Sequence, residues 1–323
     1  MPGSTSRLWL PPRPSPPELA AGAAAGAAAR LAAPLLAGFA REAMGHLVDT
    51  NGTHRERYLN PEADTGWFGP GSVTWRVHAD IAMLVAGLGA FALQSLHPRA
   101  LAGVVDHSSF GDDFFGRTKR TGAYILAVTY GTSAEATKAV RTVQKIHQRV
   151  IGVTPDGRPY QASEPELLHW VHVTQYAATA AAHQRFAAHP LGHAELDRYI
   201  AEVARVGEAM EVADPPRSWA ELDAALQHHR PHLAVGEQAR EALRFLADPP
   251  GLALALKPVW RVLFAGGMAS LPPFARRLIG VRSPTMPEVA ACRALVRATG
   301  ALLDEPVSLA RARAHLEAML RAA

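Results

Sequence analysis

The stretch AVRTVQKIHQRVIG, residues 139–152, has the spacing of a helix with one buried side and a histidine on that side. Val140, Val143 and Val150 recur at helical intervals, and His147 falls at the same spacing. A buried imidazole must satisfy two nitrogens, and leaving one unpaired costs about 1–3 kcal/mol. His147 is therefore either a core histidine bonded to a carbonyl of a facing helix or an axial ligand of a haem iron, since haem is flat and apolar.

Around this stretch the composition predicts an all-α protein. The chain has 323 residues, of which 48% are hydrophobic and only 7% aromatic. Long runs of Ala and Leu, with little alternation of Val, Ile and Thr, favour helices over strands. We expect a tail over residues 1–18, where the prolines gather, and one large multi-helix domain over residues 19–323.

The formal net charge is +4, and arginines scattered among acidic residues carry most of it. Scattered charge argues against a nucleic-acid partner and is compatible with peripheral contact to an anionic membrane. One cysteine, Cys292, excludes an internal disulfide and a CxxCH haem attachment, and a helical context predicts a buried, inert thiol. A cytoplasmic location is the prediction.

The Ala/Gly run after the tail is interrupted by Arg30, and neither half approaches the roughly 20 apolar residues of a membrane span. We expect a packed helix there, with an export signal as the alternative. Residues 51–70 are predicted to be loop, and helix resumes at Trp75. The nearly uncharged run 80–96 predicts a buried helix that ends at His97-Pro98.

Capping signals place the next helices. The segment TGAYILAVTY, residues 121–130, closes at Gly131, and Thr132 with Glu135 forms a capping box for a helix expected to reach Gly152. Ser163-x-x-Glu166, with a proline between, predicts a helix to about residue 186. Further helices are expected over SWAELDAALQHH, VGEQAREALRFLAD and residues 287–303, and no nucleotide-binding motif appears.

The segment RTKRT, residues 117–121, is the second candidate for chemistry. Arg117 and Thr121 lie one helical turn apart on one face, with Arg120 beside them. A guanidinium and a hydroxyl that converge suit the anionic oxygens of polarised dioxygen or of a haem propionate. The alternative is a solvated helix N-terminus whose arginines face water.

Other histidines offer weaker patterns. Glu166, His169 and His172 are spaced i, i+3, i+6, but a di-iron bundle requires a pair of ExxH motifs and two more glutamates, and only one ExxH is present. Polar residues on an amphipathic helix are therefore the favoured interpretation. His97 and His107 are expected to cap helix ends or to line a pocket as proton carriers.

Five segments in order resemble the catalytic domain shared by rubber oxygenases (latex-clearing proteins) and MpaB-type oxygenases: QSLHP, VVDHSSFGDD, GRTKRTGAYILAVTYG, AVRTVQKIHQRVIG and TPDGRPYQASEPELLHWVH. The resemblance runs from about Trp75 to Phe186, and more weakly to about Arg293. It implies an all-α fold that binds haem b non-covalently, with His147 as the proximal iron ligand and Arg117 and Thr121 near the haem.

The resemblance also implies cleavage of an isoprenoid carbon–carbon double bond by dioxygen. Two departures are visible. Arg120 stands where rubber enzymes carry a lysine that can approach the iron, and the glutamate proposed as their base has no secure counterpart near His97. Rubber itself is therefore a poor candidate substrate.

The sequence thus predicts a haem b-dependent oxygenase for a hydrophobic, unsaturated small molecule. His147 would bind the iron, and Arg117, Arg120 and Thr121 would contact the cofactor or oxygen. Tyr124, Trp170 and the helix over residues 80–96 are candidates for the substrate wall. The alternatives are a haem or apolar-ligand carrier without turnover, and an iron or di-metal enzyme that uses Glu166, His169 and His172.

Overall fold

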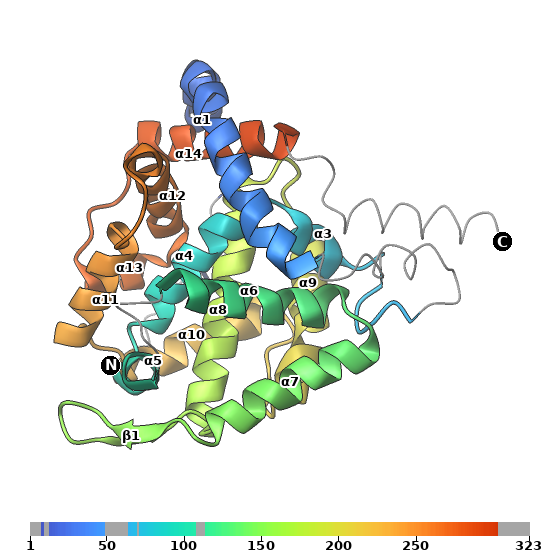
Figure 1. Ribbon diagram of the computed structural model, residues 1–323, viewed down its shortest axis with the longest axis vertical. Helices are drawn as coiled ribbons and strands as arrows, with labels where there is room; N and C mark the ends of the chain where they lie inside the picture. The colour runs from blue at the N-terminus through green and yellow to red at the C-terminus, as the bar shows by residue number, and fades with distance from the viewer. Residues whose placement is uncertain (1–7, 10–12, 49–63, 70, 108–113, 303–323) are drawn as a thin grey trace.

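A computed structural model describes residues 8–9, 13–48, 64–69, 71–107 and 114–302 (Figure 1). The fold is all-α, as predicted, with one short two-stranded hairpin in the described part of the chain. The first half of the chain forms α1 (Pro16–Val48), α3 (Val73–Ala79), α4 (Met83–Gln94), α5 (Pro98–His107), α6 (Phe114–Tyr130), α7 (Ser133–His147), β1 (Ile151–Val153) and β2 (Pro159–Gln161).

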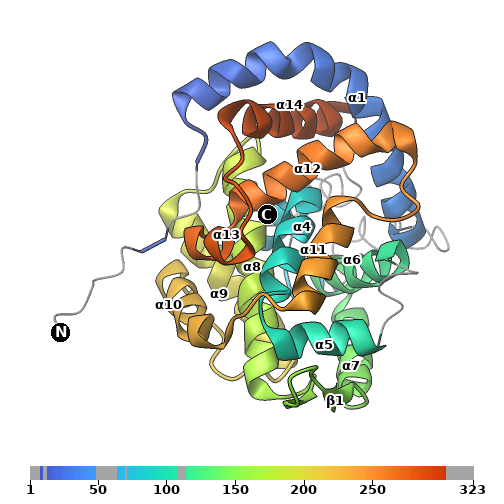
Figure 2. The same cartoon turned by 90° about the vertical axis from the view of Figure 1, so that its left-hand side faces the viewer.

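The second half forms α8 (Pro165–Phe186), α9 (His193–Ala209), α10 (Trp219–His229), η1 (Arg230–His232), α11 (Glu237–Ala247), η2 (Leu254–Leu256), α12 (Lys257–Ser270), α13 (Pro273–Ile279) and α14 (Met286–Leu302). Helix α8 runs through the middle of the molecule in both views (Figures 1 and 2). It packs along α4 and also contacts α9, α10, α12 and α14. A helix enclosed in this way can be apolar on every side, and most of α8 is buried.

The predicted bounds of α8 are confirmed, with Pro165 in its first turn and its end at Phe186. Proline suits that position because its missing N–H would have no partner in the first turn anyway. The predicted helix over residues 80–96 is confirmed as α4, and Pro98 begins α5. Between α3 and α4 the chain bends by 95°.

Helix α6 begins at Phe114, seven residues before the predicted segment, so Arg117 and Thr121 lie within its first two turns. The capping box of Thr132 and Glu135 is confirmed at the start of α7. Helix α7 ends at His147, not at Gly152 as predicted, because Ile151–Val153 pairs antiparallel with Pro159–Gln161. His147 is therefore the last residue of its helix.

At the top of the molecule α1 arches over α14 and bends down toward α6 (Figure 2). Over Pro16–Gly38, α1 is long and apolar enough to cross a membrane despite Arg30, contrary to the prediction. Of its most apolar stretch, 17% is buried. A buried core helix or a signal sequence can have the same composition, so this finding does not choose among them.

The first eighteen residues are partly described. Helix α1 begins at Pro16, inside the stretch expected to lack a helix, because prolines are tolerated in a first turn. Trp9 packs on Trp219 with ring centroids 5.2 Å apart, and the Trp219 indole donates a hydrogen bond to the Trp9 carbonyl. Residues 1–7 and 10–12 lie outside the described part, as do residues 51–63 and 70 of the predicted loop and 108–113 of the turn-rich interval.

Candidate functional site

His147 lies on the inner side of α7. Val140 and Ala136 on the same side are buried, Val143 is half-buried, and the His147 ring is half-buried with its Nδ1 atom cut off from solvent. Within the described residues, Nδ1 has no hydrogen-bond partner. Of the predicted buried stripe, Val140 is buried, Val143 and His147 are half-buried, and Val150 lies beyond the end of α7. No carbonyl of the described residues bonds Nδ1 of His147.

The charge state of His147 follows from its surroundings. Burial, and then the charge of Arg117, lowers the pKa of the imidazole below its ordinary value. The ring is therefore neutral at physiological pH, which is the form that ligates a metal. Arg117 approaches from α6, so the two sequence candidates come from different helices and meet at one place.

The face of α6 that carries Arg117 also carries Thr121, Tyr124 and Val128, since these residues recur at helical spacing. Arg117 is half-buried, Thr121 is exposed, and Val128 is buried. Arg120 is exposed. Burial, and then the charge of Arg120, lowers the pKa of Arg117. Thr121 thus shares a helical face with the half-buried Arg117 and remains accessible to solvent.

The C-terminal end of α6 is fixed by an interior polar network. His78 of α3 accepts or donates through both ring nitrogens, with Nδ1 at 2.8 Å from Thr129 Oγ1 and Nε2 at 3.0 Å from the Tyr199 hydroxyl. Tyr176 of α8 stacks on the His78 ring. Burial, and then the influence of Tyr124, raises the pKa of Tyr176, and Tyr124 of α6 packs against the hydrophobic core. One end of α6 is thereby anchored to the core.

These observations bear on whether the residues fit a haem. The unpartnered, neutral His147 offers a ligand atom, and Arg117 offers a fixed positive charge close to it. Thr121 and Tyr124 extend the same face of α6. The donor set and its half-buried position therefore fit a flat apolar group with anionic substituents.

The other histidine candidates separate into different places. His172 packs against Tyr176 at 4.8 Å between ring centroids and close to Gly207. His107 is exposed and bonds the Ile151 carbonyl at 2.9 Å. Glu166 and His169 lie instead near His97 and His229. The predicted set of Glu166, His169 and His172 is therefore not one ligand cluster.

Trp170 is fully buried, and its indole donates a hydrogen bond to the Gln94 carbonyl at 3.3 Å. Its ring contacts His97 and His229, at 6.2 and 5.2 Å between centroids. It belongs to the group of His97 and His229, and its described ring contacts do not include α6.

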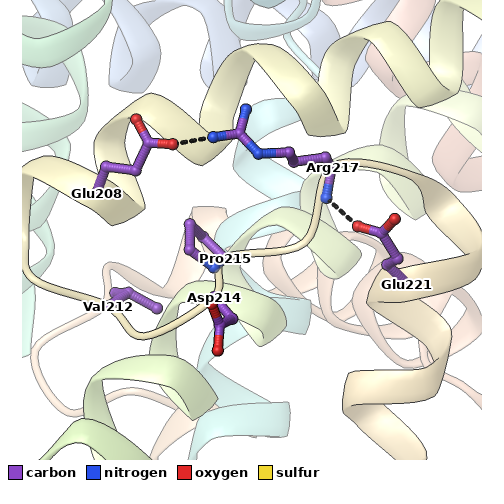
Figure 3. A pocket seen from close by; sticks show the side chains of 6 residues that line it. All are labelled: Glu208, Val212, Asp214, Pro215, Arg217 and Glu221. Atoms are coloured by element: carbon purple, nitrogen blue, oxygen red, sulfur yellow. Dashed lines mark hydrogen bonds and ion pairs between the residues drawn. The ribbon is translucent and has the colours of Figure 1, made fainter.

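Two surface pockets are lined by other residues. One, of about 580 Å³, is formed by the loop before α10 and its flanking helices (Figure 3). There the Arg217 guanidinium pairs with Glu208, and its backbone N–H donates to Glu221. The second lies along the outer face of α7, between Ser133 and Lys145. Neither pocket is lined by His147, Arg117, Thr121 or Tyr124.

The family model described as "ER-bound oxygenase mpaB/B'/Rubber oxygenase, catalytic domain" matches residues 75–301. The match begins where the sequence resemblance began and extends it to the end of α14. No curated protein and no solved structure matches the chain.

Proposed function

The chain belongs to the mpaB/B' and rubber oxygenase catalytic-domain family, and from this premise we propose that it is a haem b-dependent oxygenase. Membership makes it an oxygenase domain and hence an oxidoreductase. The haem, the substrate and the cleavage of a double bond are the proposed part. The proposed substrate is a hydrophobic, unsaturated, isoprenoid-like small molecule.

The observation that carries the proposal is the unpartnered Nδ1 atom of His147. A buried polar atom without a hydrogen bond costs about 1–3 kcal/mol, so such atoms are rare unless a ligand satisfies them. The helix that carries it is packed into the core at Ala136 and Val140, on the side that also carries His147. His147 would bind the iron through its imidazole.

Arg117 would hold negative charge close to that ligand. When bound, haem b supplies an iron centre at which dioxygen is activated. The Arg117 guanidinium would donate hydrogen bonds either to a propionate or to anionic oxygen, and the Thr121 hydroxyl, on the same face, would add a further donor. The Arg120 guanidinium would add to the positive field; it offers hydrogen-bond donors and no acceptor, so it is not a metal ligand.

The proposed overall change adds both atoms of dioxygen to a carbon–carbon double bond. The double bond breaks and each carbon becomes a carbonyl, so the atoms balance and no external reductant is consumed. Tyr124 and the apolar residues of α4 would form the substrate wall, since Tyr124 packs against the hydrophobic core and shares a helical face with Arg117.

Oxygen uptake with a panel of prenylated compounds tests this activity. We expect consumption of one dioxygen for every two carbonyl groups formed, with label from ¹⁸O₂ in both products. A protein that shows a haem spectrum and takes up no oxygen across the panel would instead be a carrier, and the oxygenase proposal would fail.

A further inference from the structure

A second group of histidines lies at the N-terminal end of α8. His97 comes from the link between α4 and α5, Glu166 from the first turn of α8, and His229 from the last turn of α10. Each offers one ring nitrogen or carboxylate oxygen, and these atoms all lie within 4.8 Å of one another. Three segments that are distant in the sequence therefore place two imidazoles and one carboxylate together.

His97 is the buried member of this group. Its side chain is 2% exposed, yet within the described part of the chain neither ring nitrogen makes a hydrogen bond. The nearest acidic atom is Glu166 Oε1, at 3.6 Å from Nε2, which is beyond hydrogen-bond distance. A buried imidazole with two unsatisfied nitrogens lacks the partner that its burial calls for.

His229 is positioned by a neighbour. Its Nε2 lies 2.8 Å from Nδ1 of His169, one turn along α8 from Glu166, while its own Nδ1 is buried without a described partner. With the proton on Nε2, His229 donates to His169 and keeps a lone pair on Nδ1. Metal-bound histidines are oriented by the same kind of bond from the second ring nitrogen.

Glu166 is oriented by Arg99. The guanidinium contacts Glu166 Oε2 at 3.3 Å and pairs also with Glu164. Oε1 is left to face His97 and His232, each at 3.6 Å. Arg99 thus occupies one carboxylate oxygen and fixes the direction of the other.

We propose that His97, Glu166 and His229 bind one divalent transition-metal ion, separate from any iron held by His147. Two imidazoles and a carboxylate form the ligand set of zinc sites with an open fourth position, and also suit Fe²⁺. Zinc bonds to nitrogen and oxygen are about 2.0–2.2 Å long, which puts tetrahedral ligand atoms roughly 3.3 Å apart. Small side-chain rotations close the present spacing to that value.

The ion is reached from the Glu166 side. The Glu166 side chain is 37% exposed and His232 lies at the rim, whereas Trp170 closes the inner side against His97 and His229. Water completes the coordination from the open side. The three ligands are close together only in the folded chain, so a bound ion stabilises the native state over the unfolded one.

Zinc titration of the full-length protein, freed of any histidine tag and treated with a chelator, tests the site. We expect one equivalent of Zn²⁺ by calorimetry and by elemental analysis. His97→Ala, Glu166→Gln and His229→Ala should each abolish this binding, and His169→Ala should weaken it by roughly 10–100-fold. His228→Ala is the matched control, since His228 is exposed and adjacent in the same helix, and it should bind like wild type.

The buried histidine variants can lose stability, so Glu166→Gln carries the decisive comparison. Zn²⁺ should raise the melting temperature of wild type and of His228→Ala, and leave Glu166→Gln unchanged. Wild type that binds no zinc, or Glu166→Gln that binds as tightly as wild type, overturns the proposal. Haem content reads out the other site independently: His147→Ala should keep its zinc, and Glu166→Gln should keep its Soret band.

Discussion

Arg117 of α6 lies close enough to His147 of α7 for its charge to act on the imidazole, and burial together with that charge lowers the pKa of His147. The positive charge of Arg117 does not stabilise the protonated form of His147. The His147 ring is half-buried, and its Nδ1 atom has no hydrogen-bond partner among the described residues. In the proposed function, a group with anionic oxygens binds close to both side chains.

Arg117→Gln should therefore damage the site while leaving the fold intact. If Arg117 binds a propionate, haem content falls; if it donates to anionic oxygen, haem content stays and oxygen uptake falls by roughly 10²–10³-fold. Arg141→Gln, an exposed arginine on the outer face of α7, is the control. Wild-type haem content together with wild-type uptake in Arg117→Gln would contradict the assigned role.

Acid should destabilise the protein through His78. Burial, and then the charge of His183, lowers the His78 pKa to about 3 in the folded state, against its ordinary value of about 6.5 when unfolded. Between these values the unfolded chain binds more protons. The contribution of His78 to the free energy of unfolding is therefore complete above pH 6.5. It is lost as the pH falls toward 3, at about 1.4 kcal/mol per pH unit.

Urea unfolding of wild type and of His78→Gln at several pH values between 7.5 and 5 measures this slope. We expect the free energy of unfolding of His78→Gln to fall less steeply with decreasing pH than that of wild type. The exposed His193, changed to Gln, serves as control and should leave the slope as it is. Parallel slopes for wild type and His78→Gln would show that His78 is not buried in its neutral form.

Gly266 of α12 is predicted not to tolerate even the methyl side chain of alanine. A Cβ atom there would lie 2.3 Å from the Sγ atom of Cys292 in α14. Cys292 is fully buried, as predicted, and burial raises the pKa of its thiol to about 12. Gly266→Ala should cost about 1–3 kcal/mol in unfolding free energy although alanine is the better helix former. Changing Cys292→Ala in the same chain should recover most of that loss.

Gly87→Ala is the matched control, because Gly87 is exposed in α4 and a Cβ there meets nothing within 4 Å. It should stabilise by about 0.5–1 kcal/mol. Equal effects of the two glycine substitutions in chemical denaturation would mean that α12 and α14 do not pack as described.

Trp170 should be a stability residue. It is fully buried between His97 and His229, so Trp170→Ala should lower the unfolding free energy by about 3–5 kcal/mol. Val171→Ala, the next residue on the same helix and 40% exposed, should change it by no more than about 0.5 kcal/mol. Circular dichroism during denaturation measures both, and a small loss for Trp170→Ala would contradict its place in the core.

Local signals predicted the helices well where they were strong. The capping box of Thr132 and Glu135 and the proline at the start of α8 each specify a helix start within a few residues, and the structure has both. The end of α7 was placed too late because three-residue strands give too short an alternation to be recognised, so the hairpin after His147 was not predicted.

Periodicity predicted that His147 lies on the inner side of its helix and that Arg117 and Thr121 share a helical face. The second group was not predictable from spacing. His97, Glu166 and His229 are 69 and 63 residues apart, and the packing of α5 and α10 against α8 brings them together.

The absorption spectrum of the purified protein, as isolated and after dithionite, tests whether His147 binds a haem. We expect a Soret band in wild type and in His193→Ala, an exposed-histidine control, and its loss in His147→Ala while circular dichroism shows the fold unchanged. A wild-type protein that takes up no haem, or a His147→Ala variant that keeps the full Soret band, would contradict it.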